Sequence, residues 1–280
     1  MEILLGALVA LGYGGGDFLG GISAKRVPTV AVLLVSQAVG LVVAFLLVVV
    51  LRDAVPDPHI FVLSAAAGVV GIAALGMLFR GLAVGRMSIV APLSAIGGGV
   101  LPVAWGLLRG ERPSPVALVG VGLALVAAAI VGRGAEHDPT PSVPPSMELA
   151  LGIGAGIGFG VVFILLAEAS SGSGMWPIFI ARLTSVPLLA VIAAVVGVSP
   201  RMARTDLLPV TGAGVCDVGA NALVLLAVRR GLVTLVAPVA SLYPAATVLL
   251  ARVVLHERIG RQRAGGLALG LVGLALIATR

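Results

Sequence analysis

Two stretches of this 280-residue chain carry the same pattern: GRMSIVAPL at residues 85–93 and GLVTLVAPV at residues 231–239. They lie 146 positions apart, and the two halves of the chain align at that spacing without a gap. The matched positions include Glu2 with Glu148, Gly12 with Gly158, Ala91-Pro92 with Ala237-Pro238, Glu111-Arg112 with Glu257-Arg258, and Gly120 with Gly266. Chance matches are easy among Gly, Ala, Leu and Val, but not among acids and prolines at one constant offset. The sequence therefore predicts an internal repeat.

The composition places both copies in a membrane. Hydrophobic residues make up 59% of the chain and charged residues 11%, whereas a soluble domain carries roughly 25% charged residues. A chain with so little charge cannot cover a water-facing surface, so its outer surface is expected to face lipid. A membrane-crossing helix needs about 20 apolar residues, so ten crossings would leave only short loops and no soluble catalytic domain.

Charges and prolines divide the apolar sequence into ten predicted spans. These are residues 3–22, 29–51, 60–79, 88–108, 115–131, 150–167, 177–196, 207–228, 232–250 and 263–278. The predicted domains are a first repeat at 1–132, a proline-rich linker at 133–147 and a second repeat at 148–280. Because five spans is an odd number, the second copy enters the membrane from the opposite side. The predicted fold is therefore an all-α polytopic membrane protein of ten transmembrane helices in two inverted five-helix repeats.

These motifs resemble the drug/metabolite transporter superfamily, in its ten-helix branch with two EamA-type domains. The resemblance rests on the two Val-Ala-Pro motifs, on the two Glu-Arg pairs and on the glycine-containing spans that follow them, and it covers nearly the whole chain. It implies transport of a small solute and cytoplasmic termini, although the arginine distribution alone favours termini outside. It implies no particular substrate, because similar carriers handle amino acids, nucleosides, sugars and organic cations.

Asp17 is the first candidate site residue. It lies deep in the first span, where a carboxylate costs about 2.5–3.5 kcal/mol on insertion-derived scales, so it should face a cavity or a partner. Tyr13 lies one turn away on the same helical face. One interpretation is an acid that binds a cation or a proton during transport, as resemblance to small four-helix relatives also implies. The alternative is an interfacial aspartate near Lys25 and Arg26 that caps or pairs locally.

A second candidate group lies in the seventh and eighth spans. Asp217 and Asn221 lie one turn apart and are expected to point inward. Arg182 would either neutralise Asp217 or bind a carboxylate substrate, and a structural ion pair and a substrate site are left as equal alternatives. Neither Asp17 nor Asp217 is repeated in the other half. The scaffold is therefore symmetrical while its polar lining is not, as expected for an asymmetric ligand.

Prolines and glycines are expected to interrupt the fourth and ninth spans. Proline removes a backbone donor and frees carbonyl groups, which need a partner in lipid. Matched interruptions in two halves point to a binding region, and the alternative is that they only kink the helices for packing. The candidate site residues from these spans are Pro92, Gly98, Pro238, Tyr243 and Pro244. The Glu-Arg pairs that precede spans five and ten are interpreted as architectural, because an acid suits a helix N-terminus.

The favoured hypothesis is a secondary transporter in the plasma membrane, an exporter of a small metabolite, amino acid or drug-like solute, with proton coupling. A lipid flippase of the same fold is the main alternative, followed by a passive channel. An enzyme is disfavoured because no histidine or lysine accompanies the membrane serines, and no cofactor or metal is expected. The net charge of +6 is scattered between spans, which disfavours nucleic acid. The expected partners are the solute, protons and membrane lipids, and a homodimer is left open.

Overall fold

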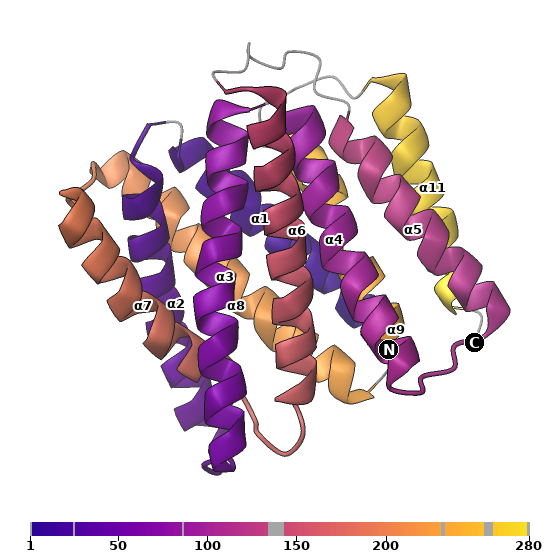
Figure 1. Cartoon of the computed structure of the whole chain (residues 1–280), viewed down its shortest axis with the longest axis horizontal. Helices are drawn as coiled ribbons and strands as arrows, with labels where there is room; N and C mark the ends of the chain where they lie inside the picture. The colour runs from indigo at the N-terminus through magenta and orange to yellow at the C-terminus, as the bar shows by residue number, and fades with distance from the viewer. Residues whose placement is uncertain are drawn as a thin grey trace.

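The computed structural model describes residues 2–24, 26–85, 87–133, 143–230, 233–254 and 260–278, and their regular structure is helical (Figure 1). The helices are α1 (Glu2–Ala24), α2 (Thr29–Leu51), α3 (Pro58–Val84), α4 (Met87–Leu108), α5 (Pro115–Arg133), α6 (Pro145–Glu168), α7 (Trp176–Val196), α8 (Arg204–Arg230), α9 (Val233–Ala240), α10 (Tyr243–Val254) and α11 (Arg261–Ala278). The predicted all-α class is confirmed. Most of the predicted linker lies outside the described residues.

The helices expose apolar side chains and bury polar ones. Leu108 and Val195 are 82% and 81% exposed, whereas Arg182 and Asn221 are 9% and 8% exposed. This distribution suits a protein whose surroundings are lipid, because polar groups in a membrane must find partners inside the protein. Six helical segments are long and apolar enough to cross a membrane: Thr29–Leu51, Pro58–Leu82, Ile89–Leu108, Pro145–Glu168, Trp176–Val196 and Arg204–Arg229. The chain is a multi-pass membrane protein, and the number of ten crossings stays a prediction.

The main helix pairs join the first half of the chain to the second. Helix α1 packs against α8, and α3 packs against α6. Helix α4 also packs against α6, while α1 contacts α9 and α10. Helix α2 packs against α7, and α5 lies beside α11 at one edge of the bundle (Figure 1). The interior of the bundle is therefore bounded by helices from both halves.

Glycines determine how closely α4 and α6 approach. A Cβ atom at Gly156 would lie 2.7 Å from the carbonyl oxygen of Leu93, and one at Gly160 would lie 2.7 Å from Cβ of Leu101. Both distances are shorter than atoms tolerate, so a larger residue would push the two helices apart. Small residues four apart are the usual means of close helix contact in membranes.

The two predicted interruptions have different outcomes. Helix α4 continues from Met87 to Leu108 although Pro92 and Pro102 lie inside it, so the interruption predicted for the fourth span is wrong. Prolines are tolerated in membrane helices whose neighbours satisfy the freed backbone groups. The ninth span, in contrast, is divided into α9 and α10 by Ser241 and Leu242. Pro244 is the second residue of α10, where its missing N–H would have had no partner within the helix.

Candidate functional site

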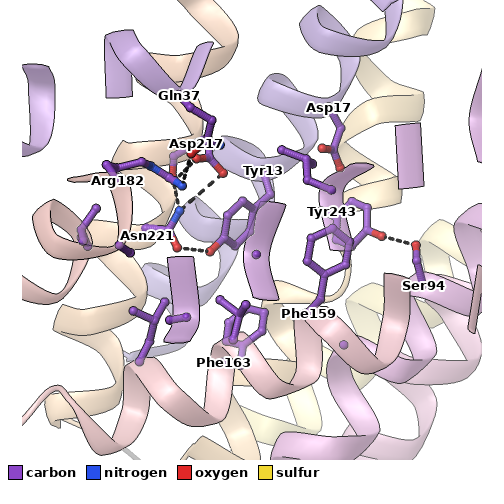
Figure 2. A pocket seen from close by; sticks show the side chains of 18 of the residues that line it. Tyr13, Asp17, Gln37, Ser94, Phe159, Phe163, Arg182, Asp217, Asn221 and Tyr243 are labelled. Carbon is purple, nitrogen blue, oxygen red and sulfur yellow. Dashed lines mark hydrogen bonds and ion pairs between the residues drawn. The ribbon is translucent and has the colours of Figure 1, made fainter. Parts of the chain in front are cut away.

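A cavity of about 90 Å³ lies inside the bundle, with side chains of α1, α2, α3, α4, α6, α7, α8 and α10 in its wall (Figure 2). Its polar lining consists of Tyr13, Asp17, Gln37, Ser94, Arg182, Asp217, Asn221, Ser241 and Tyr243. The volume holds several water molecules, since one needs roughly 10–15 Å³. Within the described segments, no group of three His, Cys, Asp or Glu residues could hold a metal ion. The chemistry of this cavity therefore depends on its polar side chains.

An ion pair occupies one wall of the cavity (Figure 2). Arg182 of α7 donates through Nη2 to Oδ2 of Asp217 on α8, and through Nη1 to Oε1 of Gln37 on α2 at 2.6 Å. The Ser185 hydroxyl donates to the same Gln37 oxygen at 3.2 Å. The structure thus brings Arg182 and Asp217 together, as one sequence-based alternative predicted. Both Nη groups of the guanidinium are engaged by the protein.

Asn221 extends this network to α1. The Tyr13 hydroxyl donates to Oδ1 of Asn221 at 3.0 Å, and Nδ2 of Asn221 donates to the backbone carbonyl of Asp217 at 2.8 Å. Residues four apart share one face of a helix, which is why both α8 side chains point into the cavity. The Tyr13 ring also meets the Phe163 ring edge to face, with centroids 6.2 Å apart. Tyr13 is therefore positioned through both its hydroxyl and its ring.

Asp17 lies one turn beyond Tyr13 on α1 and lines the same cavity. Among the described residues, no hydrogen bond or ion pair reaches its carboxylate. Arg26 instead faces Asp206 at 3.8 Å, so the local partner is not Arg26. Lys25 lies outside the described residues, so a pairing with it stays untested. Asp17 also lines a smaller cavity of about 20 Å³ toward Gly20. A carboxylate in a membrane interior without a partner is costly, which makes Asp17 the strongest functional candidate.

Tyr243 and Ser94 form the opposite wall. The Ser94 hydroxyl donates to the Ala91 carbonyl at 2.9 Å and lies 2.7 Å from the Tyr243 hydroxyl. The Tyr243 hydroxyl is therefore the donor of the second bond. Tyr243 is the first residue of α10, directly after the break in the ninth span. The break thus determines where this tyrosine enters the cavity.

Seven of the ten predicted site residues line this cavity. They are Tyr13, Asp17, Gly98, Arg182, Asp217, Asn221 and Tyr243. The other three, Pro92, Pro238 and Pro244, are buried but are not part of its lining. Their placement is compatible with an effect on helix shape, which was the alternative interpretation. The binding roles of all ten remain proposals.

Further lining residues were not predicted as site residues. Gln37 is a lone amide in an apolar span, and its rarity there was a usable signal. Phe159 and Phe163 also line the cavity, and they are the repeat counterparts of Tyr13 and Asp17. The repeat alone could therefore have placed them. Two further lining residues, Ser94 and Ser241, had no comparable signal, because serine is common in membrane helices.

Glu111 contacts the start of a different helix from the one that the sequence suggested. It was expected to complement the start of the fifth span, but it lies at the start of α9 instead. Its carboxylate accepts from the backbone N–H of Val233 at 2.9 Å and of Thr234 at 2.8 Å, and also from the Thr234 hydroxyl. An acid at a helix N-terminus satisfies free N–H groups and complements the helix dipole. Glu111 therefore ties the first half of the chain to the second.

The fold and the cavity together define a class: a multi-pass helical membrane protein with a polar internal cavity. Residues 146–279 match the protein family described as the EamA-like transporter family. This half of the chain is therefore an EamA-like transporter domain, and the resemblance to EamA-type members of the drug/metabolite transporter superfamily is confirmed. Membership implies a membrane transporter of small solutes rather than an enzyme.

A solved structure has a similar fold over nearly the whole chain. One solved structure, described only as "Crystal structure of protein", has a TM-score of 0.81 and 18% sequence identity, and the match covers 99% of this chain and 96% of that chain. At this identity the likeness shows the fold alone. No curated protein matches the chain in sequence.

Proposed function

We propose that the chain is a secondary active transporter that exports a small solute by alternating access and couples this movement to protons at Asp17. The observation that carries the proposal is the Asp17 carboxylate, which has no partner among the described residues and lies in a cavity bounded by both halves of the chain. Outward transport and a plasma-membrane location are parts of this proposal; the family match supports a membrane transporter. The lining of the cavity comes from one chain, and a homodimer is left open.

The proposal includes two repeats, at residues 1–132 and 148–280, joined by the linker at 133–147. The helix packing supports this division: the α1–α8 contact has its counterpart in α6–α3, and the α4–α6 contact has its counterpart where α1 meets α9 and α10. Two similar halves of opposite orientation can exchange which side of the membrane is open around a fixed central site.

Asp17 suits an exchange of proton for solute because no described residue supplies a free cation near it. The other charged groups of the cavity are Asp217 and Arg182, which pair with each other. The remaining titratable groups facing this space are the hydroxyls of Tyr13 and Tyr243. A proton and a solute cation would each neutralise the same carboxylate, so they compete for it. That competition is the physical basis of the proposed coupling.

The polar contacts of the cavity also join the two halves. Tyr13 of α1 binds Asn221 of α8, Ser94 of α4 binds Tyr243 of α10, and Gln37 accepts from Arg182 of α7. A solute that competes for these groups changes how the halves are held together. The solute would then bind the two conformations of the protein with different affinity, and a ligand can drive a conformational change only through such a difference.

The test is accumulation of radiolabelled solutes in proteoliposomes with an imposed pH gradient, using a panel of amino acids, nucleosides, sugars and amines. We expect at least one class to accumulate against its gradient, and Asp17→Asn to abolish the part that depends on the pH gradient. Asp57→Asn is the matched control, because Asp57 is exposed before α3 and its side chain caps nothing. Full pH-driven accumulation by Asp17→Asn would show that Asp17 is not the coupling group.

A further inference from the structure

The described lining of the cavity carries more negative than positive charge. Its lining contains the carboxylates of Asp17 and Asp217 and a single guanidinium, that of Arg182. Arg182 and Asp217 neutralise each other, so no charge among the described lining residues compensates that of Asp17. The space beside Asp17 therefore attracts a positive charge, and an added carboxylate would be repelled.

Arg182 is already paired with an acid of the protein. Its Nη atoms are bonded to Asp217 and Gln37, and its Nε atom is fully buried without an acceptor. That Nε lies against Gly40 of α2, where an added Cβ would come within 3.3 Å of it. A ligand carboxylate at this guanidinium would compete with Asp217 for its positive charge.

The hydroxyl donors of the cavity are also in use. Tyr13 donates to Asn221, Tyr243 donates to Ser94, and Ser241 donates to the Ala237 carbonyl. What these hydroxyls still offer a ligand is acceptor lone pairs. Among the described lining residues, the Gln37 amide nitrogen is a neutral donor to which no acceptor is assigned. The hydroxyl donors of the cavity are therefore largely used within the protein, while their lone pairs stay open to a ligand.

Aromatic rings surround the remaining space. Tyr13, Phe159, Phe163 and Tyr243 all line it, and Figure 2 shows Tyr13 and Tyr243 between Asp17 and the two phenylalanines. Ring faces attract cations, and the rings also provide apolar contact for a ligand body.

We propose that this cavity selects a small organic monocation: a protonated amine, attached to an aromatic or other apolar body, whose N–H groups donate to Asp17. This deepens, and rests on, the proposed transport function. The ammonium supplies the positive charge that would balance Asp17, and the body fills the space between the rings. Carboxylates lack a free cationic partner here, so anions and zwitterions are bound less well than the matching amine.

The test measures binding to the purified full chain by titration calorimetry with three ligands that share a phenylethyl body. Phenethylamine carries an ammonium group, 2-phenylethanol carries a neutral hydroxyl, and hydrocinnamate carries a carboxylate. We expect phenethylamine to bind about tenfold more tightly than the other two, as one charge-assisted hydrogen bond predicts. Equal binding of the three, or tighter binding of hydrocinnamate, overturns the proposal.

Variants then assign the preference to Asp17. Asp17→Asn keeps the size of the side chain and should bring phenethylamine down to the affinity of 2-phenylethanol, while Asp17→Glu and Asp57→Asn should keep a preference for the amine. Preserved selectivity in Asp17→Asn overturns the assignment. The selectivity of the unsubstituted protein tests the site even if a variant does not fold.

The same ligands separate this proposal from the transport function. If phenethylamine binds through Asp17 but no solute accumulates in proteoliposomes, the site stands and the transport proposal fails. If hydrocinnamate or phenylalanine accumulates while phenethylamine neither binds nor competes, the transport proposal stands and the amine site is wrong.

Discussion

Arg182 and Asp217 allow a quantitative test of how strongly the cavity ties α7 to α8. The perturbation is a double-mutant cycle of Arg182→Met, Asp217→Asn and the two combined. Arg182→Met leaves the Asp217 carboxylate without its cation, and Asp217→Asn leaves the guanidinium with Gln37 as its partner. The double variant removes both charges and leaves neither unpaired.

The expected loss of stability follows from the burial of the Arg182–Asp217 ion pair. Removing one partner of a fully buried ion pair costs about 3–5 kcal/mol, because the other charge is left uncompensated. The Asp217 side chain is 28% exposed to the cavity. Polar contacts in membrane proteins also average only about 0.6 kcal/mol, because the unfolded helices still find partners in the membrane. Between these limits we expect each single substitution to lower the free energy of unfolding by about 2 kcal/mol, and we expect a coupling energy of about 2 kcal/mol between the two substitutions.

The assay is equilibrium unfolding of the purified protein by a denaturing detergent, followed through tryptophan fluorescence. The matched control is the same cycle on Arg26 and Asp206, which lie 3.8 Å apart with the Arg26 side chain 68% exposed. Solvent screens such a pair, so its coupling should not exceed about 0.5 kcal/mol. If the Arg182 and Asp217 variants prove additive within about 0.5 kcal/mol, the pair does not tie the two helices and the reasoning from burial is wrong.

Two further changes test the packing around the cavity by the same unfolding assay. Glu111→Gln removes the negative charge at the start of α9 and should lower the free energy of unfolding by about 1–2 kcal/mol; no change would show that the contact contributes nothing. Gly156→Ala should cost about 1–3 kcal/mol because its Cβ meets the Leu93 carbonyl at 2.7 Å. Gly122→Ala, which points into open space, should be neutral or stabilising. Equal effects of both alanines would contradict the close α4–α6 contact.

The membrane class could be read from the sequence because lipid acts on every residue of the surface. A low content of charge and long apolar runs are local properties, so no knowledge of contacts is needed to interpret them. The same reasoning placed Asp17, Asp217 and Asn221 inward, since a polar side chain in an apolar span has few other places to go. All three line the cavity.

The tertiary structure alone decided the course of the proline-containing spans. Each carries two prolines, Pro92 and Pro102 in one and Pro238 and Pro244 in the other, yet α4 is continuous and the ninth span is divided. Whether a freed carbonyl finds a partner depends on neighbouring helices, which a single span does not specify. For the same reason the sequence could not show that Glu111 caps α9.

The distribution of partners in the cavity likewise required the fold. The sequence by itself predicted that Asp17, Asp217 and Arg182 lie well inside membrane spans. Only the packing of α2, α7 and α8 decided that Asp217 and Gln37 take up Arg182, while Asp17 has no such partner among the described residues. Gln37 and Arg182 lie 145 positions apart, and charges interact through distance in space rather than along the chain.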